Sequence, residues 1–260
     1  MNNTLSHLQC SPNQLASTVL MPGNPERADT MAKQLKNPVN IGRYREFVSW
    51  TGLYNGQPVS IISTGIGGPS TAIAVEEAIS AGAQALIRVG TCGGAWRSDI
   101  PCGSVILPTA CIRSEGTTVE YLPPEFPAVA DFNVIMQLRQ QAKDLNIPVS
   151  TGINRTHDAY YGPSNSQKIW ADRFTACRVS MQQQPIISSD MECSILYTLA
   201  SIRGVKAGCV LAVNAQPEPL TVEESGTYVP VMKSSELNAQ QAEDNAITLA
   251  LMSARLFSNE

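Results

Sequence analysis

Residues 86–94 read Leu-Ile-Arg-Val-Gly-Thr-Cys-Gly-Gly, a short apolar run that contains one arginine and ends in glycines. A run of this length bounded by glycine predicts a strand that is buried in a sheet. A guanidinium inside such a strand is costly unless an anion or a carboxylate meets it. Arg88 therefore predicts either an internal ion pair with Asp or Glu or a bound phosphate or carboxylate ligand.

Similar apolar runs recur along the chain and alternate with segments of helical spacing. The predicted strands are Thr18–Met21, Val59–Ser63, Ala85–Val89, Val105–Leu107 and Val210–Val213. The predicted helices are Ala28–Leu35, Thr71–Ser80, Phe132–Leu145, Cys193–Ile202 and Ala239–Phe257. This alternation is typical of an α/β domain. No shift in composition divides the chain, so we expect one domain over residues 1–260, with surface loops at Tyr121–Pro127 and Gln216–Ser235.

The composition excludes several classes of protein. The 260 residues are 43% hydrophobic and 15% charged with a net charge of -4, which is globular and unlike a basic nucleic-acid-binding chain. No apolar run approaches the roughly 20 residues needed to span a bilayer, and residues 1–11 lack a signal-peptide pattern. Seven cysteines without a C-x-x-C pair favour a reducing, cytoplasmic compartment. The chain has only two histidines, His7 and His157, too few for a zinc site built on histidine.

Two further glycine-containing turns end predicted strands. Residues 20–27 read Leu-Met-Pro-Gly-Asn-Pro-Glu-Arg, where Gly23 would let backbone N–H groups approach an anion and Arg27 lies one turn into a helix. Residues 63–70, Ser-Thr-Gly-Ile-Gly-Gly-Pro-Ser, match neither G-x-G-x-x-G nor a Walker loop, so a dinucleotide or nucleoside triphosphate is not supported. Close helix–strand packing or a simple turn would explain the same glycines.

Other side chains suit a small ligand with a phosphate and a sugar. Arg27, Arg88 and Arg45 offer planar guanidinium donors to a phosphate. Thr91 adds a hydroxyl donor. In Ser-Asp-Met-Glu-Cys-Ser (189–194), Glu192 could accept two vicinal sugar hydroxyls, or it could stabilise a helix N-terminus. Tyr160, which precedes a second tyrosine, could stack on a flat base or pack in the core.

In order and spacing, these segments and Arg-Glu-Phe (45–47) resemble the trimeric and hexameric nucleoside phosphorylase family, most closely its uridine phosphorylases. The likeness extends from His7 to the C-terminal helix. It implies a single domain with a central mixed β-sheet flanked by helices, a three-layer α/β/α arrangement. It also implies phosphate-dependent, reversible cleavage of the N-glycosidic bond of a nucleoside, giving a free base and ribose 1-phosphate.

The resemblance assigns roles to particular residues. The phosphate ligands it implies are Gly23, Arg27, Arg45, Arg88 and Thr91, and the catalytic residues are Arg88, Thr91 and Glu192. The ribose contacts it implies are His7, Met191 and Glu192. Arg45 and His7 would complete a neighbouring subunit's site, in a homo-oligomer expected to be a hexamer of three dimers. Inorganic phosphate is the co-substrate and no cofactor is expected, although a monovalent cation at the dimer interface would fall to Glu46, Ile66 and Ser70.

The base is the least determined part of the substrate. The base contacts implied by the resemblance are Tyr160, Cys92, Gly93, Ser164, Ser166 and Asn214. Ser164 and Ser166 replace the Gln-x-Arg pair that reads uracil in uridine phosphorylases, and Ala215 replaces a further family arginine. Asn214 stands where hexameric purine nucleoside phosphorylases carry an aspartate. A uridine-like substrate is the first choice; a purine nucleoside phosphorylase, a nucleosidase on the same scaffold and a non-catalytic nucleoside-binding protein are the alternatives.

Overall fold

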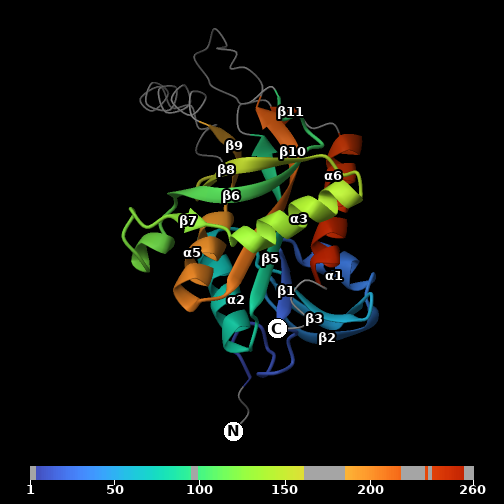
Figure 1. The fold of residues 1–260 in the computed structure, drawn as a ribbon. Helices are drawn as coiled ribbons and strands as arrows, with labels where there is room; N and C mark the ends of the chain where they lie inside the picture. Colours follow the sequence, from blue (N-terminus) through green and yellow to red (C-terminus); the bar gives the residue numbers. More distant parts are fainter. Residues whose placement is uncertain (1–3, 95–98, 161–184, 218–231, 234–235, 255–260) are drawn as a thin grey trace, which may run out of the picture.

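The computed structural model describes residues 4–94, 99–160, 185–217, 232–233 and 236–254 (Figure 1). Eleven strands form one mixed sheet within these ranges. The strands are β1 (Thr18–Pro22), β2 (Lys36–Tyr44), β3 (Phe47–Tyr54), β4 (Gln57–Ile62), β5 (Ala85–Gly94), β6 (Val105–Ser114), β7 (Ala128–Val129), β8 (Val149–His157), β9 (Ile186–Asp190), β10 (Lys206–Pro217) and β11 (Met232–Lys233). The helices are α1 (Pro25–Ala32), α2 (Gly68–Ser80), α3 (Phe132–Asp144), α5 (Cys193–Arg203) and α6 (Glu236–Met252), with a 3-10 turn at Thr118–Glu120.

The centre of the sheet is parallel. Strand β1 pairs in parallel with β4 on one side and β5 on the other, with Met21 opposite Arg88. Strands β3 and β2 continue antiparallel from β4. On the other side, β5, β10, β6, β8 and β9 pair in turn, and β9 pairs back to β5. The sheet therefore closes into a ring over these five strands, which the sequence pattern did not predict.

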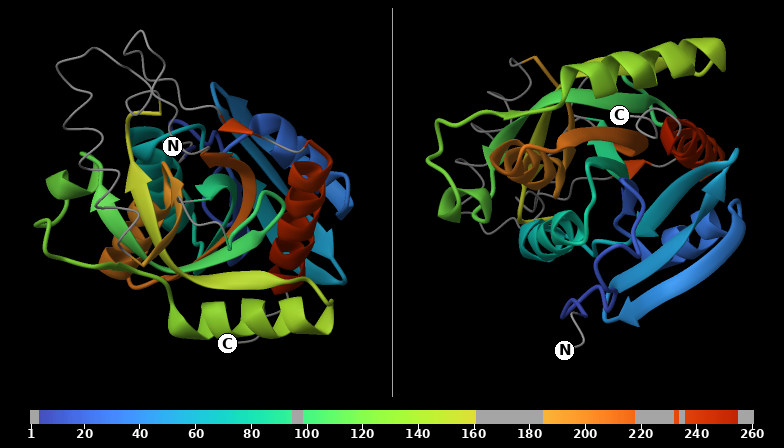
Figure 2. Two further views of the ribbon diagram at one scale, coloured as in Figure 1. Left: turned by 90° about the horizontal axis from the view of Figure 1, so that it is seen from above. Right: turned by 60° about the horizontal axis from the view of Figure 1, so that its bottom comes forward.

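Helices cover both faces of the sheet (Figure 2). Buried residues of α2 and α5 share one apolar cluster with Val19, Met21 and Leu86. Buried residues of α1, α3 and α6 share a second cluster with Leu20 and Ile87. Neighbouring residues of one strand thus belong to opposite clusters, as the alternation of side chains along a strand requires. The expected three-layer α/β/α fold is confirmed.

The turn after β1 shows why a helix begins there. The Asn24 side chain accepts a hydrogen bond from the Glu26 N–H (2.8 Å), and Pro25 occupies the first helical position, where no N–H is needed. Each predicted strand and helix overlaps an observed one. The Tyr121–Pro127 segment is a surface loop that Arg113 holds through the carbonyl oxygens of Leu122, Pro123 and Phe126.

The second expected surface loop, Gln216–Ser235, is described only in part. Gln216 and Pro217 extend β10, and Met232–Lys233 form β11 antiparallel to them. The remaining residues of that loop lie outside the described ranges. No described helix combines the length and apolarity needed to cross a bilayer.

Candidate active site

Three strand ends that are far apart in sequence meet at one edge of the sheet. The Thr64 N–H donates to the Pro22 carbonyl oxygen (2.9 Å) and the Gly65 N–H to the Gly23 carbonyl oxygen (3.0 Å), which joins the turns after β1 and β4. Arg88 reaches the first of these turns from β5, since its Nη1 lies 3.8 Å from where a Cβ on Gly23 would be. The carboxyl ends of parallel strands are where ligands bind in α/β proteins.

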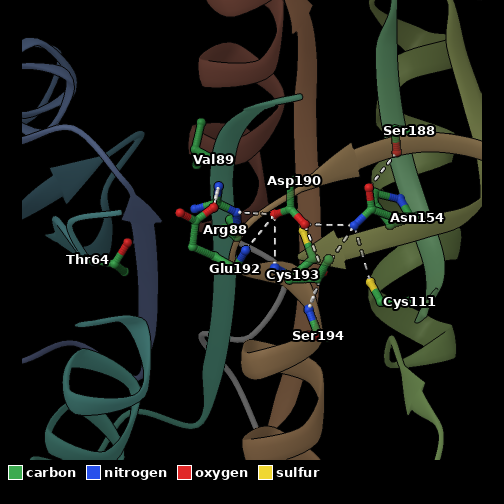
Figure 3. Close-up of polar contacts among 12 residues, drawn as sticks. Thr64, Arg88, Val89, Cys111, Asn154, Ser188, Asp190, Glu192, Cys193 and Ser194 are labelled. Atoms are coloured by element: carbon green, nitrogen blue, oxygen red, sulfur yellow. Dashed lines mark hydrogen bonds and ion pairs between the residues drawn. The ribbon is translucent and has the colours of Figure 1, made fainter. Parts of the chain in front are cut away.

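Arg88 is 5% exposed, and its guanidinium is held by two carboxylates (Figure 3). Nε donates to Oδ2 of Asp190 (3.2 Å), and Nη2 donates to Oε2 of Glu192. Nη1 is buried and has no hydrogen-bond partner among the described residues. Burial alone would lower the pKa of Arg88, but the charges of Glu192 and Asp190 outweigh it and raise the pKa, so the side chain is a fixed cation. Of the two alternatives for Arg88, the internal ion pair is present, and one donor nitrogen of the guanidinium is left without a partner among the described residues.

Glu192 connects the second glycine-rich turn to the start of α5. Its Oε1 accepts the Gly67 N–H (2.7 Å) while Oε2 accepts from Arg88. Gly67 has φ +89°, a conformation that favours glycine. Burial raises the pKa of Glu192, against the opposing effect of Arg88. Each carboxylate oxygen has a further lone pair, so Glu192 can still accept hydrogen bonds from a ligand.

Asp190 organises the cluster, a role that the sequence analysis did not assign. Its Oδ1 accepts from Nδ2 of Asn154 (2.8 Å) and from Oγ1 of Thr156 (2.9 Å) on β8. Its Oδ2 accepts the backbone N–H groups of Glu192 (3.1 Å) and Cys193 (2.9 Å) at the start of α5. The sequence showed Asp190 beside Glu192, and it showed Asn and Thr two residues apart, which places both on one face of a strand.

Arg27 lies at the same edge of the sheet, and its side chain is 10% exposed. Its Nη1 donates to the carbonyl oxygen of Val89 on β5 (3.3 Å), and its Nε donates to Oε1 of Glu243 on α6 (2.7 Å). Thr91 is half-buried further along β5, and Met191 is half-buried between the two site carboxylates. The structure thus gathers Gly23, Arg27, Arg88, Thr91, Met191 and Glu192 around these strand ends.

Arg45 and His7 contact other parts of the same chain. Arg45 is exposed, and its Cζ lies 5.4 Å from the centre of the Tyr44 ring. His7 Nδ1 lies 2.7 Å from Oε1 of Glu77 on α2. Their expected place in a neighbouring subunit's site stays a prediction, because the structure contains one chain.

Two of the residues expected at a cation site, Glu46 and Ser70, lie together. The Ser70 hydroxyl lies 3.1 Å from Oε1 of Glu46 and within hydrogen-bonding distance of the Thr64 carbonyl oxygen. Ile66, in the turn between Thr64 and Ser70, is 77% exposed. Carboxylate and hydroxyl oxygens are hard ligands that suit an alkali cation.

The expected base contacts are described only in part. A bulge in β10 between Val213 and Ala215 places Asn214 next to the pairing with Cys92 and Gly93 of β5, and Asn214 is exposed. Tyr160 follows β8 and is 60% exposed. Ser164 and Ser166 lie outside the described residues.

Comparison with known proteins identifies the family of this chain. A uridine phosphorylase from Treponema pallidum (strain Nichols) is 40% identical over 217 residues, 80% of each chain. A crystal structure of a purine nucleoside phosphorylase from Toxoplasma gondii in complex with immucillin-H has a TM-score of 0.82 at 27% identity and covers 98% of this chain and 96% of its own. A uridine phosphorylase structure from Vibrio fischeri ES114 has a TM-score of 0.77 at 26% identity, with 96% of this chain and 95% of its own covered. Because the model of the phosphorylase superfamily matches residues 17–252, and relatives and structures align over most of the chain, this protein belongs to the phosphorylase superfamily.

Proposed function

We propose that this chain is a nucleoside phosphorylase, with uridine-like nucleosides as its first substrates. The observation that carries the proposal is the unpartnered Nη1 of Arg88, which is buried and directed at the Gly23 turn. A charged donor buried without a partner costs free energy, so this position favours an anion. Backbone N–H groups at the start of α1, the remaining donors of Arg27 and the Thr91 hydroxyl would complete a phosphate site.

The charge of the cluster supports a contribution from a second subunit. Two arginines, Arg27 and Arg88, are paired with three carboxylates, those of Asp190, Glu192 and Glu243. Such a cluster has no excess positive charge with which to hold a phosphate dianion. Arg45 of a neighbouring chain would add a positive charge that offsets the excess of carboxylates, and a homo-oligomer, the hexamer of three dimers that the resemblance implies, would bring it to the site. A monovalent cation near Glu46 and Ser70 belongs to the same proposal.

The proposed reaction needs no covalent enzyme intermediate. A phosphate oxygen attacks C1′ of the sugar as the C1′–N bond breaks; the base nitrogen keeps the electron pair of that bond and takes up the proton that monohydrogen phosphate loses. The sugar passes through a state with oxocarbenium character, which the adjacent phosphate stabilises electrostatically. Glu192 would hold the 2′- and 3′-hydroxyls so that C1′ faces the phosphate.

Two classes of base remain candidates. The uridine phosphorylases among the relatives favour a pyrimidine, while the likeness to a purine nucleoside phosphorylase structure favours a second candidate, a purine nucleoside. Asn214, exposed beside Cys92 and Gly93, offers an amide that can both donate and accept at a base edge. We further propose a cytoplasmic location, because six described cysteines are free thiols.

The test is release of free base from uridine, thymidine, inosine and adenosine, each with and without inorganic phosphate. We expect release only with phosphate, and fastest from uridine. Release that is equal without phosphate would show a nucleosidase. Tight nucleoside binding without release from any of the four would show a binding protein.

A further inference from the structure

The contact between Arg27 and Glu243 joins the proposed phosphate site to the C-terminal helix. Arg27 is the third residue of α1 and Glu243 lies near the middle of α6. The Arg27 Nε donates to Oε1 of Glu243 at 2.7 Å, with the arginine side chain 10% exposed and the glutamate side chain 30% exposed. A charge-assisted hydrogen bond of this length between largely buried groups fixes the direction of the guanidinium.

The second contact of Arg27 determines which of its donors remain available. Nη1 donates to the Val89 carbonyl oxygen (3.3 Å), one residue after Arg88 on β5. Among the described residues, Nη2 has no hydrogen-bond partner. The guanidinium is therefore held through Nε and Nη1, beside the residue of β5 that follows Arg88, and Nη2 is the donor left for a ligand.

The packing of α6 does not depend on Glu243. The helix is anchored to the second apolar cluster through Ala242, Ala246, Leu249 and their neighbours. The ion pair of Glu243 with Arg27 is instead a polar contact between α6 and α1 at the edge of the sheet. A carboxylate there also has an electrostatic cost, because it weakens the attraction of Arg27 for an anion.

We propose that Glu243 is a positioning residue that orients Arg27 for phosphate binding. This inference rests on the proposed function, since it assigns Glu243 to the phosphate site of that reaction. Orientation requires the hydrogen bond from Nε, whereas the charge of Glu243 works against phosphate. Removing the whole side chain should therefore weaken phosphate binding, and Glu243→Gln, whose amide oxygen can still accept from Nε, should restore most of it.

The experiment measures inorganic phosphate binding by calorimetry and the KM values for phosphate and for the nucleoside, using the full-length chain. For Glu243→Ala we expect the Kd and the KM for phosphate to rise about tenfold, which is the effect on affinity of losing one hydrogen bond to a charged group. The KM for the nucleoside should not change. Glu243→Gln should lie within about threefold of wild type. Asp244→Ala is the matched control, because it removes an exposed acid from the next position of the same helix.

The possible results separate the two proposals. Unchanged or tighter phosphate binding in Glu243→Ala, with wild type binding phosphate normally, overturns the role of Glu243 alone. A rise in both KM values together, or a loss of thermal stability without a change in phosphate binding, also overturns it. If Glu243→Ala does not fold, Glu243→Gln is compared with Arg27→Ala. Phosphate binding that is equally weak in these two variants overturns the positioning role of Glu243. A wild-type chain that neither binds phosphate nor needs it for base release overturns the proposed function itself.

Discussion

Oδ2 of Asp190 accepts a hydrogen bond from Nε of Arg88 (3.2 Å). The same oxygen also accepts hydrogen bonds from the two backbone N–H groups at the start of α5. Arg88 carries the free donor of the proposed phosphate site, and Glu192 at the start of α5 carries the proposed acceptor of the sugar hydroxyls. Their relative position is therefore set by a residue that needs no contact with substrate. Phosphate and sugar binding should depend jointly on Asp190.

Replacement of Asp190 by Asn should cost both stability and activity. The asparagine amide carries an NH2 donor in place of one carboxylate oxygen. In one orientation this NH2 group would face the Arg88 donor, and in the other it would face the donors of Asn154 and Thr156. Breaking a buried ion pair in this way typically costs about 3–5 kcal/mol. We expect a loss of about 3 kcal/mol in the free energy of unfolding, measured by urea denaturation, and at least a tenfold loss in kcat/KM.

The control for this prediction is Asp29→Asn. Asp29 also pairs with an arginine, Arg43 (2.6 Å), but both side chains are partly exposed, so the change should stay within about 1 kcal/mol. If Asp190→Asn is as stable and as active as Asp29→Asn, Asp190 does not organise the site.

Gly90 leaves the space that the Arg88 guanidinium occupies. A Cβ at this position would lie 2.8 Å from Nη2 and 2.9 Å from Cζ of Arg88, closer than real Cβ contacts allow. Gly90→Ala should therefore displace the guanidinium and weaken phosphate binding about tenfold or more, the effect of losing one hydrogen bond to a charged group, while the circular dichroism spectrum is retained. Gly116→Ala is the matched control, since its new Cβ would meet its nearest neighbour at an ordinary 3.6 Å. Equal phosphate affinity in both variants would contradict the prediction.

The sequence predicted the buried parallel strands well because each is a short apolar run. It did not predict β2 or β8, whose residues are mostly exposed or half-buried and form no such run. Strand β9 was missed for another reason: its second half, Ser188 to Asp190, is polar yet buried. A buried polar strand looks like a loop until its hydrogen-bond partners are known.

The same limit applied to the site. Glycines and arginines at strand ends marked Gly23, Arg27 and Arg88, the acidic segment 189–194 marked Glu192, and the resemblance to a family added Met191. The partners that hold them were not visible, because Asp190 lies 102 residues from Arg88 and Glu243 lies 216 residues from Arg27. Contacts over such separations depend on the pairing of strands, which periodicity does not determine.

The raised pKa of Glu192 predicts a pH dependence of nucleoside binding. Burial raises this pKa above the usual value of about 4.3. Glu192 must be ionised to accept two sugar hydroxyls, so nucleoside affinity should fall as the pH is lowered through the raised pKa. Calorimetric titration without phosphate isolates this effect from phosphate ionisation, and a midpoint at or below the usual glutamate value would contradict it.

The contribution of Glu192 to the free energy of unfolding should depend on pH in the opposite direction to its contribution to nucleoside binding. Since the folded chain protonates Glu192 more readily than the unfolded chain does, this carboxyl favours folding below its unfolded pKa, and the contribution disappears as the pH rises through the folded pKa. Glu192→Gln should remove this part of the pH dependence of unfolding, measured between about pH 4 and 7. If the pH dependence of the variant matched that of wild type, Glu192 would not be its source.

Subunit mixing tests whether Arg45 completes a neighbour's site. Arg45→Ala and Arg88→Ala should each be nearly inactive alone. In a mixed oligomer formed from equal amounts, an intact site arises when Arg88 of one subunit meets Arg45 of the other type. Random pairing makes about a quarter of the sites intact, so about a quarter of wild-type activity should return. Arg27→Ala mixed with Arg88→Ala is the control. Within one chain, Arg27 contacts Val89, the residue after Arg88, so both arginines belong to the same site and no mixture can restore it. Recovery in the first mixture only would show that the site is shared between subunits. If mass spectrometry shows that mixed oligomers have formed and neither mixture recovers, Arg45 does not complete a neighbour's site.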